Sequence, residues 1–248
     1  MTKTVLISGG SRGIGRATAL IMAGQGWNIA FTYRGDHDAA QQAVEEIRAK
    51  GAEAIAIQGD TVQEDHVVRA FDETISTFGG LDAVVVNAGV VAPSMPLAEM
   101  SIERLKTIFD TNVLGAVLFA REAARRLPDQ KTGKDAAIVL VSSAAARLGS
   151  PFEYVDYAAS KGAIDTLTLG LSKELAGQGI RVNAIRPGLI ETDLHASGGQ
   201  PDRAERLSKA IPIARPGTAH EVGSAIAWLC SEEASYCTGG ILDVTGGR

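Results

Sequence analysis

The sequence predicts an α/β protein built on a doubly wound parallel sheet of about seven strands, with helices on both faces. Three observations predict this class. Apolar strand-like runs recur along the chain, most of them are continuous rather than alternating, and helical stretches separate them. Continuous runs indicate strands buried on both faces, which is typical of a parallel sheet covered by helices. We therefore expect right-handed crossovers and a ligand site beyond the carboxyl ends of the strands.

The expected elements follow one another in a regular order. Each apolar run, from TVLIS onward, is followed by a turn and a stretch of helical character. We expect strands over residues 4–8, 28–33, 52–58, 82–87, 136–142, 180–186 and 239–244. We expect helices over residues 13–22, 37–50, 63–78, 101–127, 155–177 and 219–230. No repeat or convincing linker divides the chain, so we expect a single domain over residues 1–248.

Composition and charge exclude several classes of function. The 24 basic and 29 acidic residues give a net charge of −5 with no long Lys/Arg cluster, so no nucleic-acid partner is expected. No apolar run approaches the ~20 residues that span a bilayer, and no targeting pattern opens the chain, which predicts a cytoplasmic protein without membrane contact. Cys230 and Cys237 are expected to be reduced thiols. No metal site is expected, because the histidines lie far apart and are expected on the surface: His37, His66, His195 and His220.

The first turn carries the earliest functional signal. Ser8-Gly9-Gly10-Ser11-Arg12-Gly13-Ile14-Gly15 follows the first strand and opens directly into an apolar helix. Glycines allow close backbone approach, so the unpaired N–H groups of the helix N-terminus can receive a pyrophosphate. A tight strand-to-helix turn without a ligand is the alternative interpretation, because such a turn also favours glycine.

Further motifs follow in a fixed order: Asp60, Asn87-Ala88-Gly89, Asn112, Ser143, Tyr157-x-x-x-Lys161, and Pro187-Gly188 with Thr192. With the GxxxGxG turn, this set resembles the short-chain dehydrogenase/reductase family over essentially the whole chain. The sequence is similar to the group that includes glucose dehydrogenases and 3-oxoacyl carrier-protein reductases. The resemblance implies a Rossmann-type fold that binds NAD(P) and transfers a hydride to or from a carbonyl or alcohol.

The end of the second strand bears on the choice of cofactor. An acidic residue there binds the ribose hydroxyls of NAD, whereas a basic one favours the 2′-phosphate of NADP. Here Tyr33 stands where NAD-dependent members of the family usually carry Asp, and Arg34 follows it. With Arg12, two guanidinium groups could flank one phosphate. We therefore expect NADP, with NAD as the alternative. Asp36 and Asp38 lie close by and weaken the argument, and the alternative interpretation makes Arg34 a solvated loop charge and Arg12 a helix-start residue.

The resemblance extends this site to other residues. It places Asp60 at the adenine ring and Asn87 in backbone positioning, whereas a helix N-cap and a left-handed turn residue are their respective alternatives. The family often has a second Asn where this chain has Val86. The cofactor-binding residues expected are Gly9, Ser11, Arg12, Gly13, Ile14, Gly15, Tyr33, Arg34, Asp60, Thr61, Asn87, Ala88, Gly89, Tyr157, Lys161, Pro187, Gly188, Ile190 and Thr192.

The Tyr157 and Lys161 pair indicates proton transfer. Four residues apart on an expected helix, the two side chains project from one face. A nearby ammonium stabilises phenolate, so we expect Lys161 to lower the pKa of Tyr157 toward the working range. Tyr154 has Ala158 four residues on and lacks such a partner, so we expect it to be a wall of the substrate pocket.

Two polar side chains complete the expected catalytic set of Asn112, Ser143, Tyr157 and Lys161. Ser143 follows a strand and can donate to the oxygen on which charge builds, with Ser142 as the weaker contender. The separation of Ser143 and Tyr157 is one residue longer than is common in the family. The family uses the equivalent of Asn112 in a water relay behind Lys, whereas an Asn within a helix is otherwise more often on the surface.

The sequence therefore predicts an oxidoreductase that moves a hydride between NADP(H) and a small carbonyl or secondary alcohol. The alternative is a catalytically idle NADP-binding sensor, which would keep the glycine turn without needing the proton machinery. The substrate loops are expected near residues 90–100, 144–155 and 189–215. The resemblance implies a homotetramer assembled through the long helices and the last strand.

Overall fold

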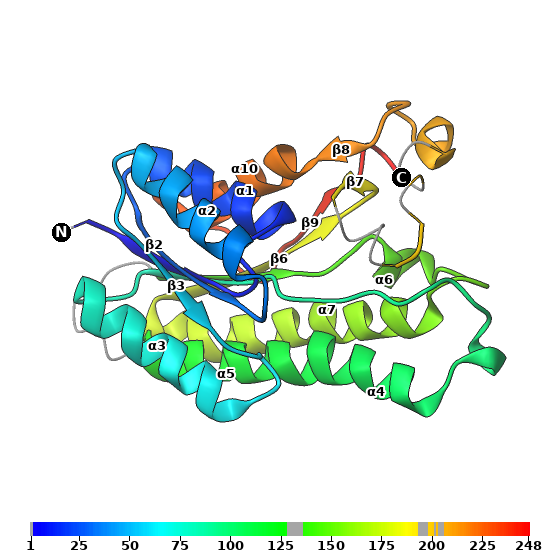
Figure 1. Cartoon of the computed structure of the whole chain (residues 1–248), viewed down its shortest axis with the longest axis horizontal. Helices are drawn as coiled ribbons and strands as arrows, with labels where there is room; N and C mark the ends of the chain where they lie inside the picture. Colours follow the sequence, from blue (N-terminus) through cyan, green and yellow to red (C-terminus); the bar gives the residue numbers. More distant parts are fainter. Residues whose placement is uncertain (1, 128–135, 193–197, 201, 203–205) are drawn as a thin grey trace.

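The structure is a computed structural model that describes residues 2–127, 136–192, 198–200, 202 and 206–248 (Figure 1). Its centre is a seven-stranded sheet in the order β3-β2-β1-β4-β5-β6-β9, and all its pairings are parallel. The strands are β1 (Thr4–Ile7), β2 (Asn28–Tyr33), β3 (Ala54–Gln58), β4 (Ala83–Val86), β5 (Ala136–Val141), β6 (Ile180–Pro187) and β9 (Ile241–Val244). This confirms the predicted fold class.

Helices cover both faces of this sheet (Figure 1). One face packs against α1 (Gly13–Gly24), α2 (His37–Ala49) and α10 (Ala219–Cys230). The other packs against α3 (Glu64–Phe78), α5 (Ala116–Arg126) and α7 (Val155–Leu175), with α4 (Ile102–Phe109) beside α7. Most strand residues of the sheet are buried and apolar, so each face buries its own core. On the second face, Phe71 and Phe119 meet with ring centroids 5.2 Å apart and join α3 to α5.

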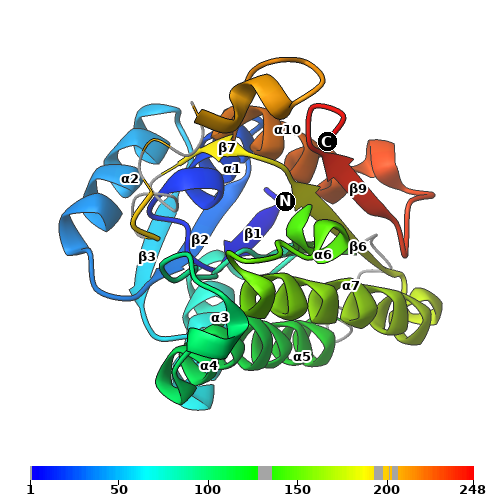
Figure 2. The same cartoon turned by 90° about the vertical axis from the view of Figure 1, so that its right-hand side faces the viewer.

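The strand order reverses at β1, which pairs with both β2 and β4. In such a sheet the connections leave β1 and β4 in opposite directions and open a crevice at the carboxyl ends of the strands. Shorter elements lie near this edge, including α6 (Ala145–Leu148), β7 (Ile190–Glu191) and β8 (Gly217–Thr218). In Figure 2 this end of the molecule faces the viewer, with α6 in front of the sheet and β7 above β1 and β2.

The expected helix over residues 101–127 is not a continuous α-helix. It consists of α4, a π-helical segment η2 (Asp110–Gly115), and α5. A π-helical turn holds an extra residue and is often found at functional sites. Its last residue touches the turn after β3, since a Cβ placed on Gly115 would lie 2.8 Å from Thr61 Oγ1. The apolar periodicity of the sequence cannot distinguish such a turn from a regular one.

Several other boundaries differ from the expected ones. The strand expected from 52 begins at Ala54, and the one expected from 239 begins at Ile241, after Gly239 takes a left-handed φ of 73°. The expected loop over 144–155 contains α6. Short helices in the described part of the chain include η1 (Leu97–Glu99), η3 (Ala176–Gln178), η4 (Ser208–Ala210) and η5 (Glu232–Ala234).

The described cysteines and histidines differ in their exposure and in their hydrogen-bond partners. Both cysteines are free thiols, and burial raises the pKa of Cys230 to about 12. His66 is half-buried and its Nδ1 accepts from the Asp60 N–H at 3.2 Å, so the expected surface position is wrong for this histidine. His195 lies outside the described residues. Within the described ranges, no cluster of His, Cys, Asp and Glu is arranged to hold a metal ion, and no helix is long and apolar enough to cross a membrane.

Candidate active site

The glycine turn forms a cradle in which side chains do not fit. A Cβ on Gly15 would lie 2.3 Å from the Gly9 carbonyl oxygen, and one on Gly10 would lie 2.4 Å from Phe31 Cβ. Arg12, the N-cap of α1, makes no capping side-chain bond, and the first helical turn contains no acidic residue. The backbone N–H groups and the positive end of the helix dipole therefore suit an anion. The pyrophosphate of a dinucleotide is negatively charged and narrow, so it suits the electrostatics and the shape of this glycine turn.

Hydrogen bonds hold the end of β4 against this turn. Asn87 Nδ2 donates to the carbonyl oxygens of Ser8 and Gly9, both at 3.0 Å. The backbone N–H groups of Asn87 and Ala88 both donate to Ser8 Oγ at 2.9 Å. Asn87 has no left-handed backbone, so that alternative is wrong. Ser8, which the sequence analysis did not assign, holds the two strand ends together.

The residues after β2 lie beside the N-terminus of α1. Arg12 Nη1 is 3.6 Å from Asp36 Oδ2, and both side chains are exposed. Asp36 also caps α2, because its Oδ1 accepts from the Ala39 N–H at 3.1 Å. Arg34 is exposed, and Tyr33 Oη is 3.0 Å from His37 Nδ1. Arg12 is therefore already partly neutralised by Asp36, whereas Arg34 extends a basic side chain into solvent.

Asp60 and Thr61 follow β3 near the same crevice. Asp60 Oδ1 accepts from the Val62 N–H at 3.2 Å, and Gln63 is the N-cap of α3. Asp60 is therefore not the helix cap that the alternative interpretation suggested. Thr61 is buried against Gly115 of the π-helical segment.

Asn112 is at the centre of a buried hydrogen-bond network. Its Oδ1 accepts from the Val90 N–H at 2.8 Å, and its Nδ2 donates to the Val90 carbonyl at 2.9 Å and to Ser160 Oγ at 3.1 Å. Ser160 Oγ in turn donates to the Tyr157 carbonyl at 2.7 Å. Asn112 is 1% exposed, so the alternative of a surface residue is wrong. It joins the segment after β4 to α7, which carries Tyr157.

Lys161 is buried beside this network. Its Nζ donates to the Val141 carbonyl at 2.8 Å and lies 5.7 Å from the centroid of the Tyr157 ring. Burial lowers the pKa of Lys161 to about 8, because the charged form loses hydration, while Asp165 acts in the opposite direction. A Cβ on Gly89 would be 3.3 Å from both Lys161 Nζ and Asn112 Oδ1. The backbone at Gly89 thus passes close to both side chains.

Tyr157 departs from one expectation. Burial raises the pKa of its phenol, and the hydrogen bond with Ser143 lowers it by a smaller amount. The expected lowering of this pKa is therefore wrong for this structure, because loss of hydration raises the pKa more than the hydrogen bond with Ser143 lowers it. At neutral pH Tyr157 is a phenol, the form that can donate a proton.

Ser143 and Ser142 have separate environments. Ser143 bonds to Tyr157, and its Oγ accepts from the Ala145 N–H at 3.1 Å. Ser142 Oγ instead donates to the Lys161 carbonyl at 3.1 Å and is buried beneath α7. Of the two contenders, Ser143 is the one that lies beside the phenol.

A pocket of about 110 Å³ opens beside Tyr157 and Ser143. Val91 lines it from the 90–100 loop, Leu148 and Tyr154 from the 144–155 segment, and Leu189 from the segment after β6. All three expected substrate loops thus contribute to the pocket, and Tyr154 is part of its wall as expected. Parts of the 189–215 loop lie outside the described residues. Arg248 also lines the pocket, although the sequence analysis assigned it no role.

The segment after β6 completes the crevice. The Gly188 N–H donates to the Val244 carbonyl at 2.9 Å, and a Cβ on Gly188 would be 2.7 Å from Thr245 Cα. Ile190 is buried in β7. Thr192 faces the first turn, since its Cγ2 would be 3.6 Å from a Cβ on Gly13. The segment after Pro187 therefore returns to the glycine cradle.

A buried ion pair with α4 fixes the start of α7, the helix that carries Tyr157. Asp156 forms a buried ion pair with Arg104, with Nε to Oδ2 at 2.8 Å and Nη2 to Oδ1 at 3.1 Å. Arg104 also donates to the Pro93 carbonyl, and Asp156 Oδ1 accepts from the Tyr157 N–H at 2.8 Å. This bidentate ion pair connects α4 and the 90–100 loop to the residue next to Tyr157.

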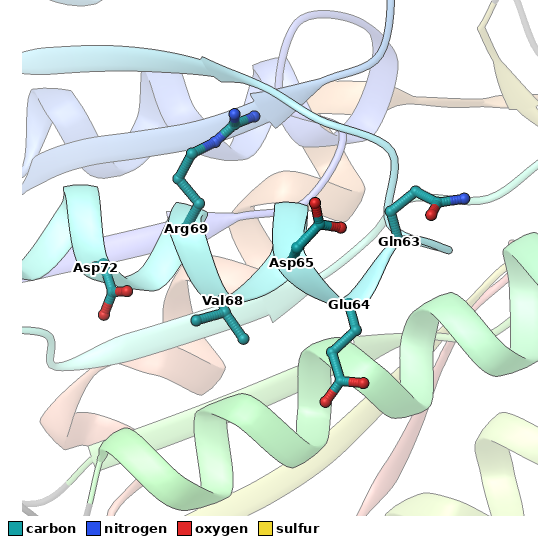
Figure 3. Close-up of a pocket in the computed structure, with 6 residues that line it drawn as sticks. All are labelled: Gln63, Glu64, Asp65, Val68, Arg69 and Asp72. Atoms are coloured by element: carbon teal, nitrogen blue, oxygen red, sulfur yellow. The ribbon is translucent and has the colours of Figure 1, made fainter.

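A larger surface depression of about 740 Å³ lies along α3 (Figure 3). Two of its charged side chains already have partners: Glu64 pairs with Arg121, and Asp72 with Arg126 at 2.8 Å. It contains none of the expected site residues. We therefore assign it no function.

A glycine cradle where the strand order reverses, next to half-buried Ser and Tyr side chains and buried Lys and Asn side chains, is typical of dinucleotide-dependent oxidoreductases with an α/β fold. Comparisons agree with this class. The family model described as enoyl-(acyl carrier protein) reductase matches residues 9–248. The chain is 49% identical over 243 residues to the uncharacterized oxidoreductase YgfF of Escherichia coli, covering 98% of both. It is 36% identical over 247 residues to the 3-oxoacyl-[acyl-carrier-protein] reductase FabG of Staphylococcus aureus, covering 100% of this chain and 98% of FabG.

Solved structures give the same result. A short-chain dehydrogenase/reductase from Mycobacterium marinum has a TM-score of 0.92 at 35% identity, covering 99% of this chain and 94% of that one. A 3-ketoacyl-(acyl-carrier-protein) reductase from Brucella melitensis, complexed with NADH, has a TM-score of 0.92 at 31% identity and coverage of 99% and 98%. A short-chain dehydrogenase from Burkholderia cenocepacia, in complex with NADP, has a TM-score of 0.90 at 33% identity and coverage of 99% and 97%. The chain belongs to the short-chain dehydrogenase/reductase family of oxidoreductases.

Proposed function

We propose that this protein transfers a hydride between NADP(H) and a carbonyl or secondary-alcohol substrate, with Tyr157 as the general acid and base. The observation that carries the proposal is the position of the Tyr157 phenol. It is half-buried and lines the pocket, hydrogen-bonded to Ser143, and close to the Lys161 ammonium. A bound nicotinamide would supply the hydride.

In the direction of reduction, Tyr157 and Ser143 donate hydrogen bonds to the carbonyl oxygen. As hydride reaches the carbonyl carbon, the Tyr157 proton passes to this oxygen, and Ser143 stabilises the charge that develops there. Lys161, charged below its pKa of about 8, then stabilises the phenolate that remains. Asn112 acts as a positioning residue through its bonds to Val90 and Ser160. In the direction of oxidation, the phenolate takes the proton of the alcohol.

Replacing Tyr157 tests this proposal. We expect wild-type protein to oxidise NADPH in the presence of a carbonyl substrate from a panel of ketones, sugars, quinones and 3-oxoacyl thioesters. Tyr157→Phe removes the proton donor but keeps the ring, so kcat should fall by about 10²–10⁴-fold. Tyr154→Phe is the matched control and should retain most of the activity. Equal losses in the two variants, or none in Tyr157→Phe, would contradict the role of Tyr157.

The cradle and the basic residues near β2 support NADP as the cofactor. The backbone N–H groups of the first turn would hold the pyrophosphate, and Arg34 and Arg12 the 2′-phosphate. The supporting residues are those expected from the sequence, from Asp60 and Asn87 to Thr192. Changing Arg34→Asp should lower kcat/KM for NADPH and spare that for NADH. An unchanged ratio of the two values would reject NADP preference, leaving NAD as the alternative cofactor.

A catalytically idle sensor would need only the cradle. The buried network of Asn112, Ser160 and Lys161 beside Tyr157 supports catalysis instead. We further propose a single cytoplasmic domain over residues 1–248 that acts on a small molecule and forms a homotetramer. Half-exposed apolar side chains on the helices of one face, Phe109, Leu114 and Leu169, support association. Cell fractionation that recovers the protein in membrane pellets would contradict the proposed location.

A further inference from the structure

The substrate pocket contains one permanently charged side chain. Arg248 lines it together with Tyr157, Ser143, Leu148 and Leu189. Among the described lining residues no other is charged, and none is acidic. A guanidinium stays protonated throughout the physiological pH range, so the pocket carries a fixed positive charge next to the proposed reaction centre.

The turn that follows β9 holds Arg248 in place. Gly246 and Gly247 take left-handed φ values of 66° and 91°, which reverse the chain after the last strand. The Gly246 carbonyl accepts from the Ile213 N–H at 3.2 Å, and a Cβ on Gly246 would be 2.8 Å from Ile211 Cγ2. The turn is therefore packed against the 189–215 segment and does not extend into solvent.

A neighbouring arginine contacts the main chain of Arg248 and not its guanidinium. Arg147, on α6, donates to the Arg248 carbonyl and lies 3.6 Å from Asp243. Asp243 is shared with Arg186, at 3.8 Å, so its charge is already divided between two arginines. Over the described ranges of the chain, the Arg248 guanidinium has neither an ion pair nor a side-chain hydrogen bond. A guanidinium that no described side chain contacts is suited to bind an anion.

We propose that Arg248 binds the carboxylate of the substrate, and that the protein acts on small oxo acids and the corresponding hydroxy acids. This inference rests on the proposed function. In reduction, hydride adds to the carbonyl carbon, the Tyr157 proton passes to the oxygen, and the carboxylate stays ionised against Arg248. A planar guanidinium fork binds a carboxylate with two parallel hydrogen bonds and thereby orients the neighbouring carbonyl.

Pairs of acids and their methyl esters test this assignment. The probes are 2-oxobutanoate, 3-oxobutanoate and 4-oxopentanoate, which place the carboxylate at increasing distance from the carbonyl, each beside its methyl ester. We expect wild-type protein to prefer at least one acid over its ester in kcat/KM. Arg248→Gln should lower this acid-to-ester ratio by about tenfold or more, as loss of a charge-assisted hydrogen bond predicts. Arg248→Lys should restore part of it.

The control for loss of charge is Arg69→Gln, which removes an exposed arginine on α3, outside the pocket. It should leave the acid-to-ester ratio at the wild-type value. An equal ratio in wild type and Arg248→Gln, or a wild type that prefers every ester, overturns the assignment even if the carbonyls are reduced.

Calorimetry separates this inference from the proposed function. Binding of 4-oxopentanoate and its ester is measured with NADPH-loaded Tyr157→Phe protein, with and without Arg248→Gln. Binding that is selective for the acid and depends on Arg248, without any turnover by wild type, rejects hydride transfer but supports the carboxylate site. Turnover together with binding that ignores Arg248 gives the opposite result, and absence of both binding and turnover overturns both.

Discussion

At the scale of single residues, the environment of Tyr157 sets its protonation state. Loss of hydration raises the pKa of its phenol, and the nearby Lys161 has a pKa lowered to about 8. The phenol is thus ready to donate at neutral pH, whereas Lys161 changes charge within a range that an assay can reach. Carbonyl reduction should therefore be steady below pH 8 and decline above it as the ammonium is lost. Alcohol oxidation needs phenolate and should rise with pH.

Replacing Ser143 tests how its hydrogen bond affects the pKa of Tyr157. Its hydrogen bond lowers the pKa of Tyr157, so Ser143→Ala should raise that pKa further. The rise of alcohol oxidation with pH should then shift to higher pH, and kcat for reduction should fall by about 10²-fold as the oxygen loses a donor. Ser142→Ala is the matched control, because Ser142 bonds to the Lys161 carbonyl instead. A profile that shifts in Ser142→Ala but not in Ser143→Ala would contradict the assignment of Ser143.

The sequence predicted those residues of the candidate site whose spacing carries information. Tyr157 and Lys161 share a helix face, and Asn112 is a polar residue in an apolar stretch. Ser8 and Ser160 were missed, because a single serine after a strand or within a helix has many ordinary roles. Arg248 was missed since only the turn after β9 brings it to the pocket. The direction of the Tyr157 pKa depends on burial, which spacing alone does not give.

At the scale of elements, the turn from β1 into α1 depends on the absence of side chains. Gly15→Ala would place Cβ 2.3 Å from the Gly9 carbonyl, which should destabilise the fold by about 1–3 kcal/mol and weaken NADPH binding. Gly24→Ala, in the same helix, meets nothing within 4 Å and should stabilise it by about 0.5–1 kcal/mol. Denaturant unfolding and cofactor titration of both variants check this. Similar effects for the two glycines would contradict the cradle.

The π-helical segment η2 is the element that the sequence could not predict. Its apolar pattern is that of one long helix, whereas the structure divides this helix around Asn112. Residues distant in sequence contact this π-helical segment. The Val90 N–H donates to Asn112, and Thr61 lies close to Gly115. By contrast, the seven strands and the other long helices were predicted to within a few residues, because burial on both faces of a parallel sheet leaves long apolar runs.

At the scale of the whole molecule, the alternation of strands and helices predicts the parallel sheet, and the handedness of crossovers brings the motifs to one edge. The proposed tetramer is not encoded by periodicity, since an exposed apolar residue does not reveal its partner. Light scattering of the full chain should give a mass near that of four chains. A mass near one chain would contradict the tetramer.

The proposed reaction transfers a hydride from the cofactor to a carbonyl carbon, and an isotope-labelling experiment follows that hydride. Wild-type protein is incubated with an accepted carbonyl substrate and NADPH deuterated at the transferable position, and the product is analysed by mass spectrometry. If the proposed hydride transfer occurs, we expect one deuterium on the carbinol carbon for each NADPH oxidised, and loss of this transfer in Tyr157→Phe. Product whose carbinol hydrogen comes from solvent would contradict it.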